Sequence, residues 1–389
     1  MYKKVLFIII FLVNFNLYSQ KSKTYSSIEE GLKAPDLVYK LDLSKKQLQK
    51  LPEAIGMFTN LTELNLNKNQ LSSLPNSFGK LVNLIKLGLA SNKFEVFPSQ
   101  LKGLQKLDFI DLSDNQLQDI PESISEYKNL IFLGVSENQL NEIPTAIGKL
   151  TNLKGLGVAS NKLKTLPESI GNLTNLIMLD ASKNQLKSLP NSLSQLAKLT
   201  RLYLYSNQLI EFPESISKLI QLTGLFLSKN NIREIPSSIE NLINLTNLSL
   251  GGNQFMSLPE SIGHLTQLVE FRCITGKLET LPSSIGNLTK LTELSFSSNK
   301  LKNIPNTIGK LTQLTKLFLS GNNLTELPES IGNLSKLNQL YLSRNNLTKL
   351  PTSFGKLKAL SWLYINDNNL SLVEKNSLQT IFPDCKIYK

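Results

Sequence analysis

The sequence predicts an elongated α/β solenoid, because a single 23-residue period runs through almost the whole chain. A repeat period of roughly 20 to 50 residues is the sequence signature of solenoid folds. Prolines keep the 23-residue spacing from Pro52 to Pro351. Asparagines keep it at positions 69, 92, 115, 138, 161, 184, 207, 230 and 253, and again at 299, 322, 345 and 368. We therefore expect one domain of about fifteen repeats over residues 38–373.

Each repeat begins with a short strand, as in "LTELNLNKNQLSSLPNSFGKLVN", which starts at Leu61. Side chains alternate along a strand, so Leu64 and Leu66 point inward while Asn65 points to the opposite side. Stacking the repeats pairs these segments into one long parallel sheet on the concave side of the solenoid. Asn69 lies where the chain leaves the strand, and its amide can satisfy turn backbone groups that would otherwise be buried unpaired.

The second half of the repeat is a short helical or 3-10 turn on the convex side. Pro75 lies where no backbone donor is needed, and Leu74, Phe78 and Leu81 then pack back onto the sheet. A single repeat cannot cover its own apolar face, so stability comes from contacts between neighbouring repeats.

The repeat unit, L-x-x-L-x-L-x-x-N-x-L-x-x-L-P-x-x-I-G-x-L-x-x, closely resembles that of the leucine-rich-repeat family over nearly the whole chain. Its L-P-x-x-I-G-x-L half is similar to the version in plant intracellular Ras-group-related proteins and in many bacterial repeat proteins. The resemblance implies a horseshoe-shaped solenoid. It specifies the function only weakly, because the family is a scaffold with many uses.

The two ends of the chain depart from the repeat. Residues 1–20 contain two lysines, a nine-residue apolar core and a polar end, which is typical of a secretory signal peptide; the alternative is a buried strand or short anchor. Residues 21–37 are predicted to form an N-terminal cap, with a capping box from Ser26 to Glu29 and a helix that ends before Pro35. Residues 374–389 are predicted to form a C-terminal cap; the alternative is a small functional motif.

At the N-terminal cap, Ile28 and Leu32 are expected to lie over the first repeat. At the C-terminal cap, a short helix is expected to close with Ile381 and Phe382, followed by a strand from Cys385 to Tyr388. The apolar core of the signal peptide is too short to span a bilayer, and no other membrane span is expected. The predicted location is therefore secreted, cell-surface or periplasmic, with a cytoplasmic location as the alternative.

The residues offer little material for catalysis. Cys273 and Cys385 are the only cysteines and His264 the only histidine, so we expect no metal site, no cofactor, no disulfide and no enzyme activity. One repeat is degenerate, with Gly276 in place of asparagine and with Phe271 and Cys273 at inward positions. It is interpreted either as a decayed repeat that still packs, or as a local change of curvature or a reactive thiol.

Aromatic residues are enriched on the concave face. Counting back from the repeat asparagine, positions six, four and two residues earlier point outward, which gives 45 positions over fifteen repeats. Nine of these are aromatic, against 7% aromatic residues in the whole chain, so chance does not account for them. Exposed aromatic clusters are typical of binding hot spots, although cross-strand stacking is an alternative role. The predicted ligand-binding residues are Phe109, Phe132, Tyr203, Tyr205, Phe226, Phe318, Tyr341, Trp362 and Tyr364.

The charge distribution narrows the choice of partner. The chain carries a formal charge of +12, yet the concave positions carry five basic and six acidic residues. Nucleic-acid binding through this face is therefore disfavoured. Three hypotheses follow. The chain is an exported monomer that binds a protein partner on its concave face, a binder of carbohydrate or envelope glycan that uses its rings as stacking platforms, or an intracellular signalling scaffold of the Ras-regulator kind.

Overall fold

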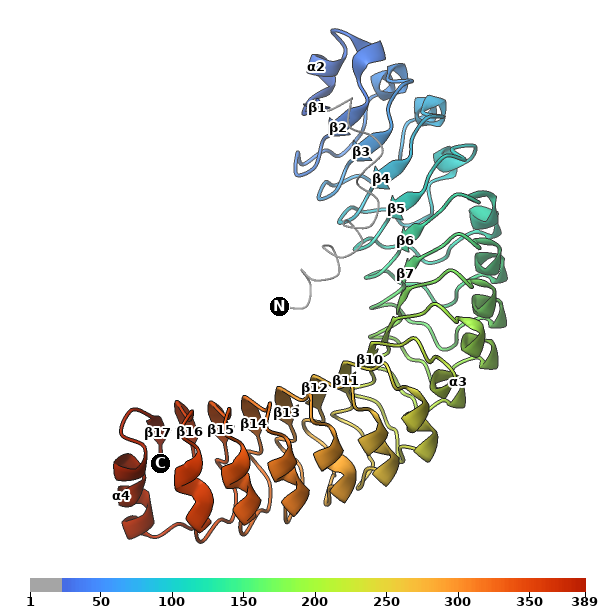
Figure 1. Ribbon diagram of the computed structural model, residues 1–389. Helices are drawn as coiled ribbons and strands as arrows, with labels where there is room; N and C mark the ends of the chain where they lie inside the picture. The colour runs from blue at the N-terminus through green and yellow to red at the C-terminus, as the bar shows by residue number, and fades with distance from the viewer. Residues whose placement is uncertain (1–22) are drawn as a thin grey trace. The chain divides into compact units, whose positions relative to one another are not determined.

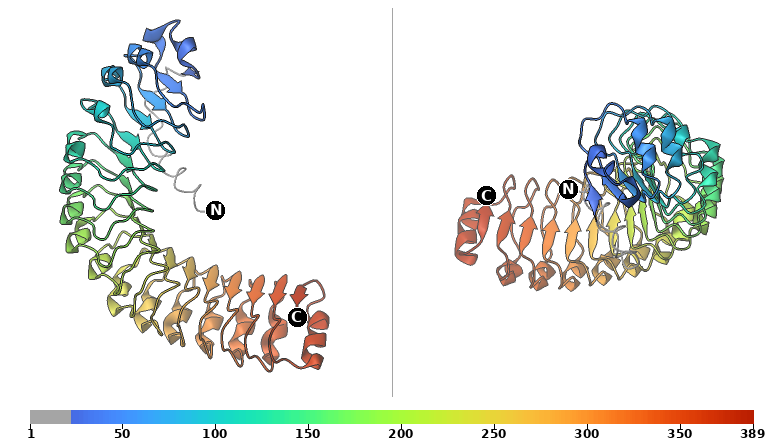
Figure 2. Two further views of the ribbon diagram at one scale, coloured as in Figure 1. Left: turned by 180° about the vertical axis from the view of Figure 1, so that it is seen from behind. Right: turned by 90° about the horizontal axis from the view of Figure 1, so that it is seen from above.

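The computed structural model describes residues 23–389, within which the chain falls into two compact units divided between Asn184 and Gln185. Unit 1 comprises residues 23–184 and unit 2 comprises residues 185–389. In each unit, short strands stack in parallel, and the 3-10 turns lie on the opposite side of the repeats from the strands (Figures 1 and 2). The predicted signal peptide, residues 1–20, lies outside the described residues.

In unit 1, each strand pairs in parallel with the strand of the next repeat. From β2 onward the register is constant, because every residue pairs with the one 23 positions later, as Lys40 does with Glu63. The strands are β1 (Thr24–Tyr25), β2 (Lys40–Asp42), β3 (Glu63–Asn65), β4 (Lys86–Gly88), β5 (Phe109–Asp111), β6 (Phe132–Gly134), β7 (Gly155–Gly157) and β8 (Met178–Asp180).

Unit 2 continues the same pattern until its last strand. The step from β16 to β17 is 24 residues, because Trp362 pairs with Lys386 and Tyr364 with Tyr388. The strands are β9 (Arg201–Tyr203), β10 (Gly224–Phe226), β11 (Asn247–Ser249), β12 (Glu270–Arg272), β13 (Glu293–Ser295), β14 (Lys316–Phe318), β15 (Gln339–Tyr341), β16 (Trp362–Tyr364) and β17 (Lys386–Tyr388).

Proline precedes nearly every turn on the far side of the repeats. Pro75, for example, has φ −70° and ψ 157°, which suits its ring and needs no backbone donor. The 3-10 turns are η2 (Pro35–Leu37), η3 (Glu53–Met57), η4 (Asn76–Lys80), η5 (Ser99–Leu101), η6 (Glu122–Glu126), η7 (Thr145–Lys149), η8 (Glu168–Asn172), η9 (Asn191–Gln195), η10 (Ser237–Asn241), η11 (Glu260–His264), η12 (Ser283–Asn287), η13 (Asn306–Lys310), η14 (Glu329–Asn333) and η15 (Thr352–Lys356). A short α-helix, α3 (Glu214–Ser217), takes the place of one of them.

The repeat asparagines do what the sequence predicts. Asn69 donates from Nδ2 to the carbonyl oxygens of Leu43 and Leu66, both at 2.9 Å. Its Oδ1 accepts from the backbone N–H groups of Lys46 and Leu48. Most of the equivalent asparagines are less than 9% exposed, so each ties one repeat to the previous one through buried hydrogen bonds.

The N-terminal helix begins one residue later than the sequence suggested. In α2 (Ile28–Gly31) the cap is Ser27, whose Oγ accepts from the N–H of Glu30, so the predicted Ser26–Glu29 capping box is wrong. Ile28 is buried, as expected, whereas Leu32 is only half-buried. The two serines are adjacent, and the backbone geometry at Ser27 decides between them.

The C-terminal segment contains the expected helix and strand. Helix α4 (Leu372–Ile381) begins at the cap Ser371, and its Leu378 is fully buried. Phe382 is buried as expected, but Ile381 is 39% exposed, so Leu378 rather than Ile381 covers the core. No helix in residues 23–389 is long and apolar enough to cross a membrane.

The degenerate repeat keeps its place in the sheet. Strand β12 pairs with both neighbouring strands, and Phe271 packs edge-on against Phe296 with ring centroids 5.3 Å apart. Cys273 is 1% exposed, and burial raises the pKa of its thiol to about 12. Cys273 and Cys385 are both free thiols. These observations favour the decayed-repeat interpretation over a reactive thiol.

Candidate binding surface on the strand face of unit 2

The strand side chains that point away from the repeat core form what we call the strand face. It carries the nine aromatic residues predicted to bind a ligand, and the structure divides them between the two units. In unit 1, Phe109 and Phe132 stack with ring centroids 4.8 Å apart and an interplanar angle of 15°. In unit 2, Tyr203 and Phe226 stack at 4.6 Å and 4°. Tyr205 shares the strand face with that pair and is half-buried.

The last four strands of unit 2 carry a longer stack, which we call the ring ladder: Phe318, Tyr341, Tyr364 and Tyr388. Consecutive ring centroids lie 4.5, 4.5 and 4.3 Å apart, with interplanar angles of 20°, 8° and 2°. The first three rings were predicted to share a column, and the structure brings them into contact. Because Phe318, Tyr341 and Tyr364 are half-buried and contact one another, cross-strand stacking is part of their role whatever else they do.

Tyr388 and Lys386 are the site residues that the sequence interpretation missed. Tyr388 extends the ring ladder and is 45% exposed. Lys386 places its Nζ 4.5 Å from the ring centroid of Trp362, a cation–π contact. Both residues follow their partners in β16 by 24 positions, so extrapolating the 23-residue period misplaces them. The alternation of Lys386, Ile387 and Tyr388 was the signal that could have found them.

The stacking determines which parts of the rings a ligand can reach. Tyr341 and Tyr364 each have a ring neighbour on both faces, so their edges and hydroxyl groups are what they present to solvent. Trp362 is covered by Lys386 on one face. Within the ring ladder, only the outer faces of Phe318 and Tyr388 lack a ring neighbour among the described residues. The ring ladder is therefore a poor stacking platform for a row of sugars.

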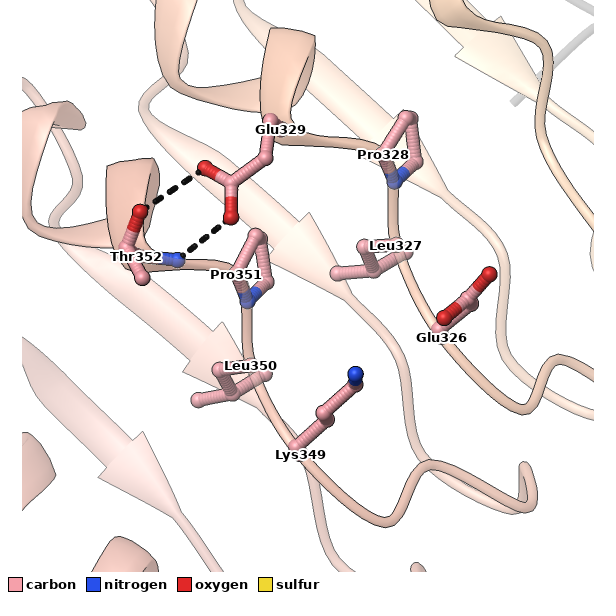
Figure 3. Close-up of a pocket in the computed structure, with 8 residues that line it drawn as sticks. All are labelled: Glu326, Leu327, Pro328, Glu329, Lys349, Leu350, Pro351 and Thr352. Atoms are coloured by element: carbon pink, nitrogen blue, oxygen red, sulfur yellow. Dashed lines mark hydrogen bonds between the residues drawn. The ribbon is translucent and has the colours of Figure 1, made fainter.

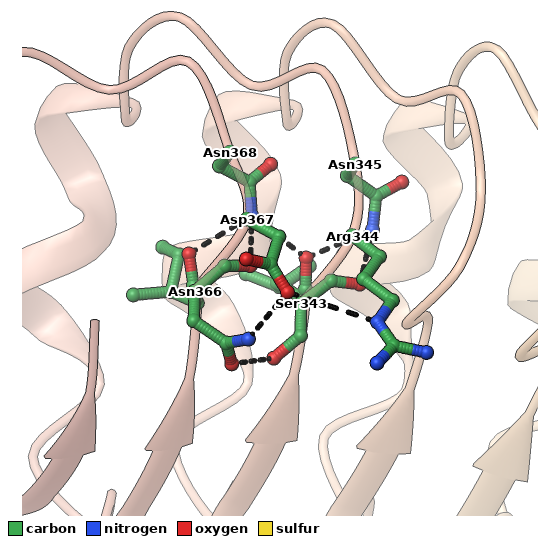
Figure 4. Close-up of polar contacts among 8 residues, drawn as sticks. Ser343, Arg344, Asn345, Asn366, Asp367 and Asn368 are labelled. Atoms are coloured by element: carbon green, nitrogen blue, oxygen red, sulfur yellow. Dashed lines mark hydrogen bonds and ion pairs between the residues drawn. The ribbon is translucent and has the colours of Figure 1, made fainter.

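A polar border runs beside the ring ladder at the ends of the strands. Ser343 donates from Oγ to Oδ1 of Asn366 at 2.6 Å, and Asn366 donates from Nδ2 to Asp367 at 2.7 Å (Figure 4). Arg344 lies 3.7 Å from Asp367, and both side chains are well exposed. The border thus combines hydroxyl and amide groups with an exposed pair of opposite charges, Arg344 and Asp367.

The titration of Tyr364 reflects its neighbours. Partial desolvation raises the pKa of this phenol, and the phenols of Tyr388 and Tyr341 raise it further. At neutral pH the hydroxyl group therefore stays protonated and can donate a hydrogen bond. Tyr341 donates a long hydrogen bond of 3.4 Å to Oε1 of Gln339.

Charged groups lie in separate parts of the strand face. In unit 2, Arg272 donates from Nε to Oε1 of Glu293 at 2.9 Å, and its Nη2 lies 3.2 Å from Glu270. Lys316 is 3.8 Å from the other oxygen of Glu293. Strands β14–β17 carry Lys316 and Lys386 but no carboxylate on the strand face. Over the fifteen repeats alone, acidic residues on the strand face outnumber basic ones by one. Adding Lys386 makes the formal net charge of the strand face zero.

The side chains on the strand face of unit 1 are smaller and more polar than those of the ring ladder. Asp111 and Asp180 are 4% and 8% exposed, and each accepts the N–H of the serine two residues later at 3.0 Å. Burial raises the pKa of both carboxyl groups, against the opposing effect of those serine hydrogen bonds. A Cβ at Gly134 would lie 2.6 Å from Oδ1 of Asp111, so a larger residue there would force this carboxylate to move.

Family comparisons agree with the repeat geometry. A family model described as "Leucine-rich repeat region" matches residues 145–225, 213–320 and 298–381, and one described as "Leucine rich repeat" matches residues 36–94. A solved leucine-rich-repeat protein of Leptospira interrogans is 34% identical, with a TM-score of 0.85 over 94% of this chain and 100% of that one. The chain belongs to the leucine-rich-repeat family.

Two other similar structures show what this leucine-rich-repeat fold supports elsewhere. The plant peptide hormone receptor RGFR1, solved in complex with RGF2, is 30% identical, with a TM-score of 0.72 over 90% of this chain and 62% of that one. An internalin, InlF, from Listeria monocytogenes is 25% identical, with a TM-score of 0.71 over 80% of this chain and 88% of that one. A comparison with curated protein sequences finds no significant match.

Two other kinds of site, a metal centre and a pocket, concern residues outside the strand face. Among residues 23–389, no three His, Cys, Asp or Glu side chains come together to hold a metal ion. A shallow pocket of about 320 Å³ lies between two adjacent L-P segments, flanked by Glu326 and Lys349 (Figure 3). There Glu329 accepts from the N–H and hydroxyl of Thr352 at 2.9 and 3.1 Å, which ties neighbouring turns together.

Proposed function

We propose that this leucine-rich-repeat protein is an exported, non-enzymatic binding protein that takes a protein partner on the strand face of unit 2. The observation that carries the proposal is the half-exposed ring ladder with Trp362 and Lys386 beside it. Aromatic side chains on an open, rigid sheet lose hydration favourably when a partner covers them, and they dominate protein interfaces. The leucine-rich-repeat fold itself is a binding scaffold without a reaction centre of its own.

The solved relatives support a protein partner. The plant peptide hormone receptor RGFR1 was solved in complex with RGF2. The glycan alternative receives less support, because the inner rings of the ring ladder cover one another's faces. A sugar would have to stack on an open face, since the negative face of an aromatic ring is the part that attracts C–H groups.

The surface is tested by capture experiments with a matched control. Purified mature protein is immobilised and used to capture proteins from envelope or host-cell extracts, next to the double variant Trp362→Ala with Tyr341→Ser. The control variant is Phe109→Ala with Phe132→Ser, which removes the stacked pair of unit 1. We expect the unit 2 variant to lose at least about tenfold in binding to the captured protein, as removal of interface hot spots does, while the control keeps it.

Thermal unfolding of each variant separates binding from folding. Retained capture by the unit 2 variant would overturn the site, and loss of capture by the control alone would move it to unit 1. A glycan array probed with the same proteins tests the carbohydrate alternative.

Export and the monomeric state are part of the same proposal and have their own measurements. The N-terminal composition of residues 1–20 supports export. Mass spectrometry of the protein recovered outside the cytoplasm should show a chain shortened by about twenty residues, and light scattering should give the mass of one chain. A full-length protein confined to the cytoplasm would instead support the signalling-scaffold alternative.

A further inference from the structure

The accessible surface of the ring ladder consists of ring edges and hydroxyl groups. Its four rings stack nearly parallel, so each inner ring presents its rim rather than its face. The rim of an aromatic ring carries partial positive charge, and a tyrosine hydroxyl is a hydrogen-bond donor. The row of rims belonging to Tyr341, Tyr364 and Tyr388 therefore attracts acceptor groups, above all negatively charged ones.

On the strand positions of β14–β17 the formal charges have the same sign, whereas the polar border pairs Arg344 with Asp367. On the strand face of β14–β17, Lys316 and Lys386 are the charged side chains, and no carboxylate accompanies them. Lys316 shares Glu293 of β13 with Arg272, whereas Lys386 lies over the uncharged ring of Trp362. By contrast, the strand face of unit 1 carries four carboxylates and two lysines: Asp42, Glu63, Asp111, Asp180, Lys40 and Lys86. An anionic ligand is thus favoured at β14–β17 and disfavoured in unit 1.

We propose that the ring ladder binds an extended polypeptide segment that carries carboxylate side chains and lies across strands β14–β17. This deepens the proposed function and rests on it. Carboxylates of the segment accept hydrogen bonds from the phenols of Tyr341, Tyr364 and Tyr388, and Lys386 supplies the matching positive charge. Ser343 and Asn366 in the polar border offer further partners to the peptide backbone (Figure 4).

The dimensions suit a short acidic motif. The outer ring centroids of the ring ladder are roughly 13 Å apart if the three spacings are collinear. An extended chain advances about 3.3 Å per residue and points alternate side chains the same way, so about four residues span the ring ladder. A Glu-x-Glu motif therefore places two carboxylates on the phenol row.

The test uses defined probes with the mature protein. A fluorescein-labelled twelve-residue peptide with two Glu-x-Glu motifs is titrated by fluorescence anisotropy, together with its Gln-x-Gln counterpart. The decisive variant is the triple Tyr341→Phe, Tyr364→Phe and Tyr388→Phe, which keeps the stacked rings and removes only the hydroxyls. We expect the acidic peptide to bind the native protein, the triple variant to bind it about tenfold more weakly, and Lys386→Gln to weaken it about threefold and reduce the salt dependence.

The other outcomes overturn the proposal in distinguishable ways. Equal binding to the native protein and the triple variant would mean diffuse attraction to surface lysines. Equal binding of the Gln peptide would remove the role of the carboxylates. Binding of polygalacturonate without binding of the peptide would assign the surface to an acidic polysaccharide. Absence of peptide binding while ring-dependent protein capture persists would reject the acidic motif alone. Loss of the ring dependence of capture would reject the proposed function.

Discussion

Unit 1 and unit 2 are built on the same repeat frame, yet their strand faces differ in size, charge and the state of their polar groups. In unit 1, small residues leave room for carboxylates that fold down onto their own backbone, as Asp111 does on Ser113. In unit 2, the same column carries the ring ladder, whose half-buried rings stack on one another. Asp111 and Asp180 of unit 1 accept hydrogen bonds of 3.0 Å from their own backbone, whereas Tyr341 of the ring ladder makes a longer one of 3.4 Å.

The difference shows how a repeat fold separates stability from recognition. Inward leucines, the asparagine and the proline keep the same roles in both units, because each contacts only the neighbouring repeat. The three outward positions of each strand lie outside that frame. They can therefore change from small and polar to large and aromatic without moving the backbone. The substitutions below test this separation, starting with the frame itself.

The largest effect is expected for the frame, and it should be equal in the two units. Asn138→Ala and Asn322→Ala each remove one accepted hydrogen bond and an Nδ2 group that donates to two carbonyl oxygens in a buried site; Nδ2 of Asn138 also donates to the carbonyl oxygen of Ser136 at 3.2 Å. We expect each to lower the free energy of unfolding by about 2–4 kcal/mol, since buried backbone groups lose their partners. Denaturant unfolding monitored by circular dichroism measures both. A difference of more than about 1 kcal/mol would show that the frames are not equivalent.

The next effect should differ between the units. Tyr341→Ala removes two ring contacts, with Phe318 and Tyr364, whereas Phe132→Ala removes the single contact with Phe109. Ring stacking contributes about 0.5–1.5 kcal/mol per pair beyond area burial. The Tyr341 variant should therefore lose about twice as much stacking free energy as the Phe132 variant. A double-mutant cycle of Tyr341→Ala with Tyr364→Ala measures the coupling energy of that one pair. A coupling energy near zero would contradict a stacking role and leave binding as the reason for the rings.

Substitution of Asp111 in unit 1 is expected to have a smaller effect, and to raise rather than lower the stability of the protein. Burial raises the folded-state pKa of Asp111, so its contribution to stability is present in acid and is lost as the pH rises through that pKa. Asp111→Asn should therefore stabilise the protein at pH 7 by about 0.5–1 kcal/mol and have little effect near pH 3. Asn65 is a matched control, because it accepts the N–H of Asn67 from the same column, at 3.1 Å. The reverse change, Asn65→Asp, should destabilise at pH 7, and stabilisation by that change would refute the account.

The smallest effect is expected on the far side of the repeats, where both units are again alike. Hydrogen bonds from the next repeat lower the pKa of two glutamates. The main donor to Glu53 is the side chain of Ser77, and the main donor to Glu329 is the backbone N–H of Ser353. Their stabilising effect is present above the unfolded-state pKa and is lost as the pH falls through the folded-state pKa. At pH 7, Glu53→Gln and Glu329→Gln should each lower the melting temperature, by less than the shift that Asp111→Asn produces. At pH 2 neither substitution should change the melting temperature. Persistence of the effect at pH 2 would point to packing instead of charge.

The sequence was sufficient for the features that recur in nearly every repeat. The 23-residue period located strands β2–β16, the inward leucines, the buried asparagines and the column shared by Phe318, Tyr341 and Tyr364. These features are repeated many times, so their pattern is visible without knowledge of contacts. The start of the N-terminal helix was harder to predict, because this helix occurs only once and Ser26 and Ser27 are both acceptable cap residues.

Tertiary structure alone decided how the outward side chains meet. The sequence placed three rings in one column, but only the structure shows that they cover one another's faces and expose their rims. Tyr388 joins them because helix α4 brings β17 beside β16 after 24 residues, a step that no 23-residue period contains. Likewise, Asp111 and Asp180 have the same side chain as the half-buried Asp42, and only their surroundings bury them. A period fixes which face a residue occupies, whereas its exposure and charge state depend on the volume of its neighbours.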